Sequence, residues 1–524
     1  MTTPDAFYGF EDLQNGLTAR KVEDFQSHVS GILTARDLLV DQQTDALADA
    51  AFKTLPYLPV SVGAMGALQS GVLSLLSEGP RPFHPRYVAP DYAHLLRSGS
   101  AFLGLKPAST LYEAVTSLLT AYHYVPNGQP VFIGRLDELL EPYVVQVDKE
   151  QAAALLRSFW LLVDRLYPSA FVHANLGPAA TSTGWMLLQI ERELKTITNL
   201  TLRYDEHLTE RAFALQAVEN ALQLAKPYFL NHSRMTADWG EDYVIASCYN
   251  AMLLGGGIYT LVRLNLKQLA LEHEVSLSVF LDELLPQAAV WLCEVIDTRI
   301  RFLVEQVGWF EKDIFIKEDL LHKDRFTAYA GVYGLAEAVA ILMARAGMPE
   351  ARYGHHPEAN AAATQITRRL AEEISTLQLP YCSATGGVAS FHAQVGIASD
   401  QGITPGCRVP AGDEPDLYAH LLAEAPQQEA IPGGISTILE FDQTAGRNPQ
   451  GVLDIVHGAF QAGVRNLSIG GCDSEFVRVT GYLIRRADLE AKREEKALRH
   501  DSSLLGTQFV AHQQNTLHRR VRKV

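Results

Sequence analysis

The sequence predicts an α/β fold in which parallel strands alternate with helices. From about residue 130 onward, short runs of β-branched and aromatic residues alternate with segments of helical periodicity. No Gly/Ser-rich linker interrupts this alternation, so we expect one large domain. Between residues 380 and 436 the helix signal fades, and Gly, Ser and Pro predict long loops of the kind that carry function on a rigid scaffold.

The N-terminal region is predicted to be mainly helical. Residues 33–55 and 108–122 repeat apolar side chains at helical spacing, and Ser109 or Thr110 can cap the second of these helices. Residues 78–92 are rich in Pro and predict a connection that is poor in strands.

Strand-like and helix-like segments follow one another through the rest of the chain. We expect strands in 130–133, 170–177, 199–205 and 465–471. We expect helices in 149–167, 183–197, 210–225, 278–307, 324–346, 448–464 and 486–501. Such an order of strands and helices favours a parallel sheet covered by helices.

The bulk composition excludes several classes of protein. The formal net charge is -16, which argues against a nucleic acid or an anionic membrane surface as the main partner. The basic end, 518–524, is interpreted as a solvated tail. Neither a signal peptide nor a long apolar span is visible, and the 5 cysteines are widely spaced, so we expect a cytoplasmic protein without a disulfide framework. The same spacing predicts no metal site.

Gly481 and Cys248 each have a simple structural explanation when considered separately. Gly481 interrupts the strand-like run 477–486, where a glycine alone is most simply a bulge or a turn. Cys248 lies among apolar residues, where a cysteine alone is most simply a small buried side chain.

Several stretches in the same order resemble glycyl radical enzymes. "RVTGY" at 478–482 is similar to their C-terminal Arg-Val-x-Gly-aromatic signature, and "GRLDELLEPY" at 134–143 to a segment that starts their barrel. The stretch 241–266, which contains Cys248, resembles the active-site cysteine region of class III anaerobic ribonucleotide reductases. Further similar segments are 199–205, 323–339 and 431–441. The best match is the YjjI family, which is related to these reductases and to pyruvate formate-lyase.

The resemblance implies a fold and a chemistry. The fold would be a ten-stranded α/β barrel of two antiparallel, five-stranded parallel half-sheets, surrounded by helices, with a helical N-terminal region. Residues 1–125 would form that region, 126–470 the barrel with the cysteine loop, and 471–524 the radical loop and a helix. Gly481 would store a backbone radical and Cys248 would become the thiyl radical that abstracts hydrogen from a small-molecule substrate. Glycine suits this task because it has no side chain to prevent the radical centre from flattening.

Partners and cofactors follow from the same resemblance. A radical S-adenosylmethionine activating enzyme would install the radical on Gly481, and no dissociable cofactor is expected. The family also implies a homodimer. A nucleotide or nucleoside reductase and a non-catalytic barrel homologue stay open as alternatives.

Two departures from the family pattern argue against particular reaction types. Eliminases carry Cys-x-Glu, whereas here Asn250 stands two residues after Cys248, so the general base is missing. Only Cys472 lies close to Gly481, so the four-cysteine zinc site of the reductases cannot form from this segment.

Three further residues are candidates for binding substrate. Asn265 follows the strand in the reductase-like stretch and could bind a substrate oxygen. Cys382 and His392 lie in the Gly-rich loop region and could line the cavity.

Overall fold

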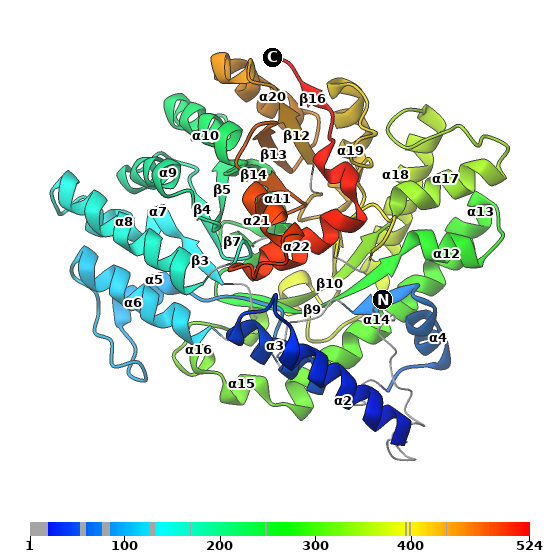
Figure 1. Cartoon of the computed structure of the whole chain (residues 1–524), viewed down its shortest axis with the longest axis horizontal. Helices are drawn as coiled ribbons and strands as arrows, with labels where there is room; N and C mark the ends of the chain where they lie inside the picture. The colour runs from blue at the N-terminus through cyan, green and yellow to red at the C-terminus, as the bar shows by residue number, and fades with distance from the viewer. Residues whose placement is uncertain are drawn as a thin grey trace.

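The computed structural model describes residues 19–52, 59–75, 84–125, 131–167, 169–246, 249–393, 396–397, 400–435 and 437–524, so Cys248 lies outside the described residues. Helices surround the strands and cover them from several sides (Figure 1). The longer helices are α2 (Ala19–Thr34), α3 (Val40–Phe52), α4 (Val62–Ser70), α5 (Tyr92–Ser98), α6 (Leu111–Tyr124), α7 (Leu136–Val144), α8 (Lys149–Leu166), α9 (Ser182–Leu194), α10 (Arg211–Leu224), α11 (His232–Trp239), α12 (Leu266–Glu272), α14 (Leu285–Arg301), α17 (Leu335–Arg345), α18 (Pro357–Thr376), α19 (Leu417–Ala430), α20 (Pro449–Gln461), α21 (Arg486–Arg493) and α22 (Asp501–His512).

The larger sheet has 7 strands in the order β16-β12-β13-β6-β5-β4-β3. Its strands are β3 (Phe132–Arg135), β4 (His173–Leu176), β5 (Asn199–Tyr204), β6 (Tyr228–Asn231), β12 (Thr437–Phe441), β13 (Asn466–Gly471) and β16 (Val521–Arg522). β3 to β6 run parallel to one another, and β12 pairs in parallel with β13 and β16. β13 pairs antiparallel with β6, so the sheet consists of two groups of parallel strands that run in opposite directions.

The second sheet has 5 strands, with β9 and β10 at its centre. Its strands are β1 (Leu73–Leu75), β2 (Tyr87–Ala89), β9 (Gly256–Asn265), β10 (Phe326–Tyr333) and β11 (Ser390–Ala393). A bridge between Val88 and Val131 joins the β2 side of this sheet to the β3 side of the larger one. The other described strands form two two-stranded sheets, β7 (Tyr243–Ala246) with β8 (Asn250–Leu253) and β14 (Phe476–Arg478) with β15 (Leu483–Arg485). No sheet of the described strands is closed, so the structure confirms an α/β fold of large sheets and many helices but not the ten-stranded barrel.

The strands near the centre separate an apolar face from a polar face. On β5, Leu200 and Leu202 belong to the main core cluster, whereas Asn199, Thr201 and Arg203 alternate with them. A period of two is what a strand needs when its two faces meet different surroundings. All of these residues are buried, so the polar face of β5 points into the protein and not into solvent.

Several sequence-based expectations differ from the structure. Residues 417–430, in the stretch expected to form long loops, are helix α19. Residues 326–333, expected to be helical, form β10, and only the second half of 324–346 is helix α17. The alanines of this stretch favour a helix, but every residue of β10 is buried, which a strand covered on both faces allows. Residues 87–89 of the supposed strand-poor connection form β2.

The basic end is not a solvated tail, because β16 pairs with β12. Arg519 and Arg522 are each 7% exposed. Both lie in a field of carboxylates that includes Glu414, Glu424 and Glu440.

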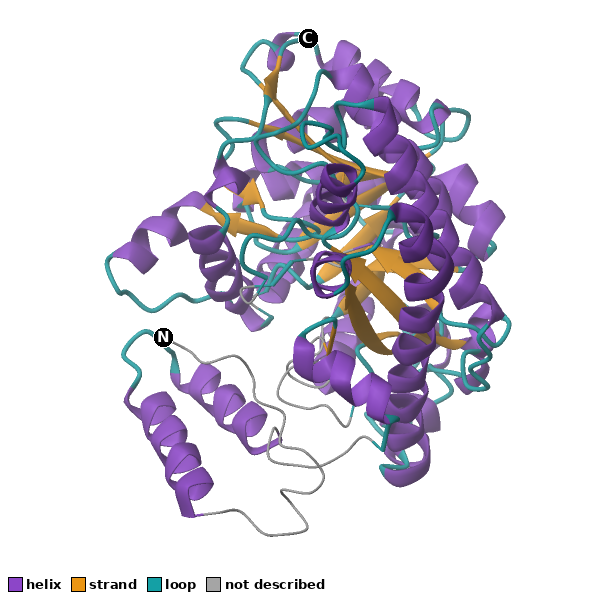
Figure 2. Cartoon of the chain, turned by 90° about the vertical axis from the view of Figure 1, so that its right-hand side faces the viewer, coloured by secondary structure: helices purple, strands orange, loops and turns teal. Residues whose placement is uncertain are grey.

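The N-terminal helices α2 and α3 lie beside the main body (Figure 2). The side chain of Asp37 pairs with Lys492 of α21, and Gln42 Nε2 donates to the carbonyl oxygen of Leu498 at 3.1 Å. These contacts attach the first helices to the C-terminal segment. Among the described helices, none combines the length and the apolar content that crossing a membrane requires.

Candidate radical site

Gly481 lies at the tip of a buried hairpin. β14 (Phe476–Arg478) pairs antiparallel with β15 (Leu483–Arg485). The backbone N–H of Val479 donates to the carbonyl of Tyr482 at 3.0 Å, which leaves Thr480 and Gly481 as the turn. Most hairpin tips face solvent, but here the two turn residues and the flanking Val479 and Tyr482 are all buried. The tip is therefore inserted into the protein.

An apolar cluster holds the hairpin in place. The cluster contains Phe476, Val477, Val479, Tyr482, Leu483 and Ile484 of the hairpin together with Ala170, Ile197, Leu224, Ala225, Phe509 and Val510. Phe509 and Val510 belong to α22, which covers the hairpin near the centre of the molecule (Figure 1). Burial of this many apolar side chains excludes water from the tip.

Left-handed backbone geometry does not account for the glycine. Gly481 is not among the described glycines whose φ lies in the left-handed region, such as Gly434 and Gly463. Asn199 of β5 instead approaches this point closely, since its side-chain Nδ2 donates to the carbonyl of Gly481 at 2.8 Å.

Arg478 fastens the hairpin to the larger sheet. Its Nε and Nη2 both donate to the carbonyl of Ala225, at 3.1 and 2.5 Å, and its guanidinium lies 5.5 Å from the centre of the Tyr228 ring. Arg519, near the C-terminus, donates to the carbonyls of Arg478 and Val479 at 3.1 Å each. The arginine of the "RVTGY" motif thus has a structural role: it fixes the strand that leads to Gly481.

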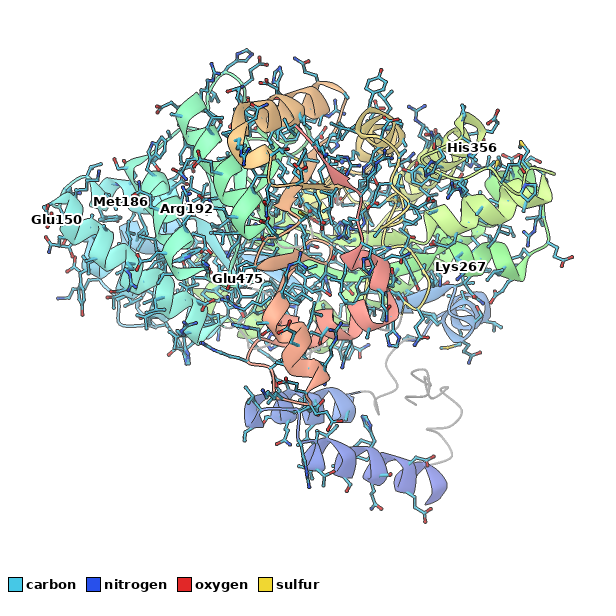
Figure 3. The ribbon with its side chains drawn as sticks, turned by 45° about the horizontal axis from the view of Figure 1, so that its top comes forward. Glu150, Met186, Arg192, Lys267, His356 and Glu475 are labelled. Carbon is cyan, nitrogen blue, oxygen red and sulfur yellow. The ribbon has the colours of Figure 1, made fainter. Side chains whose placement is uncertain are left out.

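The base of the hairpin is held by ion pairs at the surface. Glu475, which precedes β14, pairs with Lys195 and with Arg485 at 2.9 Å each. In Figure 3, Glu475 lies near the middle of the view, between Arg192 on one side and Lys267 on the other. The hairpin therefore runs from a partly exposed base to a buried tip, and exposed pairs of this kind contribute little to stability.

Tyr249, the residue after Cys248, approaches the hairpin from the opposite direction. Its ring centre lies 4.9 Å from that of Tyr228, the ring on which Arg478 rests. Its hydroxyl is 2.8 Å from the hydroxyl of Ser468 on β13, and its φ of 61° is unusual for a residue with a side chain. The hairpin of Gly481 and the neighbour of Cys248 thus contact the same tyrosine.

His392 lies on β11 in the smaller sheet. Its ring stacks on Tyr329 of β10, with the centres 4.5 Å apart and the planes at 17°. The side chain is buried, and neither ring nitrogen has a hydrogen-bond partner among the described residues. Burial, with a smaller contribution from the charge of Arg86, lowers its pKa to about 3, so the ring is neutral at physiological pH.

Gly433 brings His392 and Tyr249 to one place. A Cβ at Gly433 would lie 2.5 Å from the carbonyl oxygen of Tyr249 and 3.9 Å from Nδ1 of His392. The glycine therefore lets three elements meet: the Cys248 segment, β11 and the loop before β12.

Asn265 and Cys382 are not among the residues that meet at Gly433. Asn265 ends β9 and caps α12, since its Oδ1 accepts from the N–H of Gln268 at 3.1 Å. Cys382 is buried in the main core cluster with Cys293 and Tyr259, and burial raises the pKa of its thiol to about 11. Of the three expected substrate residues, the structure brings His392 toward the Cys248 segment and gives Asn265 a capping contact.

The sequence-based predictions do not include the residues that contact the Gly481 hairpin and the residue after Cys248. Asn199, Tyr228 and Tyr249 were not singled out, although Asn199 begins a recognised stretch. The alternation of polar Asn199, Thr201 and Arg203 with leucines was a usable signal, because it predicts a polar face inside the protein. Among the described residues, no group of three or more His, Cys, Asp or Glu side chains is arranged to hold a metal ion.

Comparisons with known proteins place most of this chain in one family. The family model of the YjjI-like glycyl radical enzymes matches residues 38–522. Protein YjjI of Escherichia coli K12 is 40% identical over 476 residues, which cover 90% of this chain and 91% of the relative. A protein of Haemophilus influenzae is 35% identical over 467 residues, which cover 88% and 90%.

Solved structures share the fold at low sequence identity. The B12-independent glycerol dehydratase of Clostridium butyricum has a TM-score of 0.68 and 12% identity, with 96% of this chain and 85% of that chain covered. The anaerobic ribonucleotide reductase of Thermotoga maritima, in complex with dATP and CTP, has a TM-score of 0.66 and 12% identity, with 94% and 100% covered. With a family model that spans most of its length and a relative at 40% identity, the chain belongs to the YjjI-like family of glycyl radical enzymes.

Proposed function

We propose that Gly481 stores a backbone radical and that Cys248 becomes the thiyl radical that abstracts hydrogen from a small-molecule substrate. The observation that carries this proposal is the hairpin: its buried tip places Gly481 against β5, and Tyr228 joins it to the segment of Cys248. A solvent-free tip suits a radical, because water is kept from the α-carbon.

The proposed chemistry consists of balanced hydrogen-atom transfers. The S–H bond of Cys248 breaks and a second C–H bond forms at the α-carbon of Gly481, which leaves the unpaired electron on sulfur. The thiyl radical then takes one hydrogen atom from a substrate C–H bond, and the substrate radical rearranges. The product radical recovers a hydrogen atom from Cys248, and Gly481 returns one to the sulfur.

Activation requires a partner. A radical S-adenosylmethionine activating enzyme would remove one hydrogen atom from Gly481, and the active protein would be a homodimer in the cytoplasm. The two sheets would form the two halves of a ten-stranded barrel around the reacting residues. The family supports the activating enzyme, the homodimer and the barrel by resemblance, and the widely spaced cysteines support the cytoplasm.

His392 is the described residue best placed to bind substrate. A neutral imidazole with two unpartnered nitrogens can donate one hydrogen bond and accept another. Asn250 is the residue two after Cys248, so the carboxylate that eliminases carry at this position is absent. The proposal for His392 is therefore binding of a polar substrate group, without proton abstraction by a neighbouring carboxylate.

The test is electron paramagnetic resonance of protein activated without oxygen. Wild-type protein, incubated with an activating enzyme, S-adenosylmethionine and a reductant, is expected to give a doublet from the single α-hydrogen of Gly481. Gly481→Ala removes this signal, whereas Gly458→Ala, at an exposed glycine of α20, retains it.

A second measurement tests Cys248. In deuterated buffer the thiol becomes S–D, and repeated transfer between sulfur and Gly481 replaces the α-hydrogen by deuterium, which collapses the doublet. Cys248→Ser is expected to keep the doublet. A wild-type protein that gives no organic radical under these conditions, or a doublet that collapses equally in Cys248→Ser, would contradict the proposal.

A further inference from the structure

Asn199 contacts Gly481 from outside the hairpin. It is fully buried at the start of β5, and its side-chain Nδ2 donates to the carbonyl oxygen of Gly481 at 2.8 Å. A hydrogen bond at this distance is well formed. The two residues are far apart in sequence, so the bond joins the hairpin tip to the larger sheet.

The orientation of the Asn199 amide is determined by its other partners. Its Oδ1 accepts from the backbone N–H of Leu200 at 3.1 Å, and Nη2 of Arg478 lies 3.4 Å from the same oxygen. Both partners are donors, so the oxygen must face them. The Nδ2 group therefore faces the carbonyl of Gly481, and rotating the amide by 180° would break all three contacts.

This bond acts on the peptide unit that carries the radical. A peptide group is planar, so fixing the carbonyl oxygen of Gly481 also fixes the position of its α-carbon. The unpaired electron of a glycyl radical is delocalised onto the adjoining carbonyl, so a donor at this oxygen also touches the spin-bearing group. Hydrogen transfer to a thiyl sulfur needs close and correctly oriented partners.

We infer that Asn199 is a positioning residue for radical transfer: its amide holds the Gly481 carbonyl and so fixes the α-carbon in the position from which hydrogen transfer occurs. This inference rests on the proposed function, because it assigns a role to Asn199 only if Gly481 carries the radical. Arg478 supports it by holding the oxygen of the same amide.

The test replaces the amide and follows the radical without any substrate. Asn199→Leu removes the donor at similar size, and Asn199→Asp replaces the donor by an acceptor. The matched control is Asn220→Leu: Asn220 is also fully buried and donates to a backbone carbonyl, that of Leu188 at 2.7 Å, but it lies on α10. Each protein is activated, and the doublet and its collapse in deuterated buffer are recorded.

The expected result distinguishes a displaced Gly481 α-carbon from a general loss of stability. Both Asn199 variants should show a collapse slowed on the order of 100-fold, as expected for a reacting atom displaced by about 1 Å, together with a changed doublet splitting. Asn220→Leu should keep the splitting and the rate of the wild type. If the Asn199 variants match Asn220→Leu in both readouts, the inference is wrong even though the wild-type radical forms.

A measurement on the wild type covers the case in which the Asn199 variants do not fold. Electron–nuclear double resonance of the wild-type radical in deuterated buffer should detect an exchangeable deuteron hydrogen-bonded to the Gly481 carbonyl, with an added nitrogen coupling change when asparagine is labelled with ¹⁵N. Absence of that deuteron overturns the inference. Absence of any radical in the wild type contradicts the proposed function instead.

Discussion

Two buried, neutral histidines make the folding stability of this protein depend on pH. Burial holds the pKa of His392 at about 3, and burial with the nearby charges of Arg478 and Lys226 holds the pKa of His173 well below its ordinary value of 6.5. A histidine that must stay neutral when folded binds a proton more readily in the unfolded chain. Folding stability from these groups is therefore complete above pH 6.5 and is lost as the pH falls toward 3.

His392→Gln should make stability less dependent on pH. As the pH falls from 6.5 to 5, each such histidine contributes a loss in the free energy of unfolding whose slope rises to at most about 1.4 kcal/mol for each pH unit. The variant should lose this contribution, whereas His512→Gln, at an exposed histidine, should follow the wild type. Urea denaturation at pH 7.5, 6.5 and 5.5 measures the difference, and equal slopes in wild type and His392→Gln would contradict the assignment.

Residue types alone lead to the prediction that Gly481 and Cys248 carry the radical, and this stays a prediction; they give no indication of the surroundings of either residue. Gly481 and Cys248 follow from short motifs, because the chemistry demands those two side chains. Asn265 seemed equally suited to bind substrate, but an asparagine at a strand end also caps a helix, and the sequence does not distinguish the two uses. The contact of Asn199 cannot be predicted from sequence, because its partner, the carbonyl of Gly481, lies on a distant segment.

The close approach of α22 to the radical hairpin depends on a glycine. A Cβ at Gly506 would lie 2.4 Å from Cγ2 of Ile484 and 3.1 Å from Cε2 of Tyr482. Real Cβ atoms do not tolerate the first distance, so α22 or the hairpin would have to move. Helix α22 therefore covers the hairpin closely only because position 506 has no side chain.

Gly506→Ala should loosen the hairpin although alanine favours helices. Overpacking costs about 1–3 kcal/mol, which exceeds the helix-propensity gain of about 1 kcal/mol. Gly458→Ala is the matched control, since a Cβ there meets nothing within 4 Å and the propensity gain stands alone. Hydrogen exchange of residues 476–485 should be faster in Gly506→Ala and unchanged in Gly458→Ala. Unchanged exchange in both variants would show that α22 accommodates the methyl group.

Local patterns predicted helices better than strands. The helices on either side of β5 follow from clear periodicity, and α9 and α10 lie where the sequence predicts them. β10 was mistaken for helix because a strand buried on both faces has no alternation to reveal it. The pairing of β16 with β12 could not be predicted from the basic C-terminus, because β12 and the carboxylates near Arg522 belong to segments distant in sequence.

At the scale of the whole molecule, the segment after Gly481 is built into the fold. β15, α21 and α22 pack in or beside the hairpin cluster, and β16 adds a strand to the larger sheet. Arg519 and Arg522 bring buried charge to the same region, where Arg522 Nη2 donates to Nδ1 of His420 at 2.8 Å. The C-terminal segment is thus attached to both the radical site and the opposite edge of the sheet.

Exposure of the activated protein to air should cut the backbone at Gly481 without separating the pieces. Oxygen adds to the α-carbon radical and the resulting peroxyl group leads to scission at this residue. Residues 482–524 should stay bound, because they carry Tyr482, Leu483 and Ile484 of the apolar cluster as well as β16. A denaturing gel should show two bands, whereas size-exclusion chromatography in native buffer should show one species that separates only in urea. Gly481→Ala should remain whole in both. Release of the C-terminal piece in native buffer would mean that the covalent link at Gly481, and not the packing of α22 and β16, retains this segment.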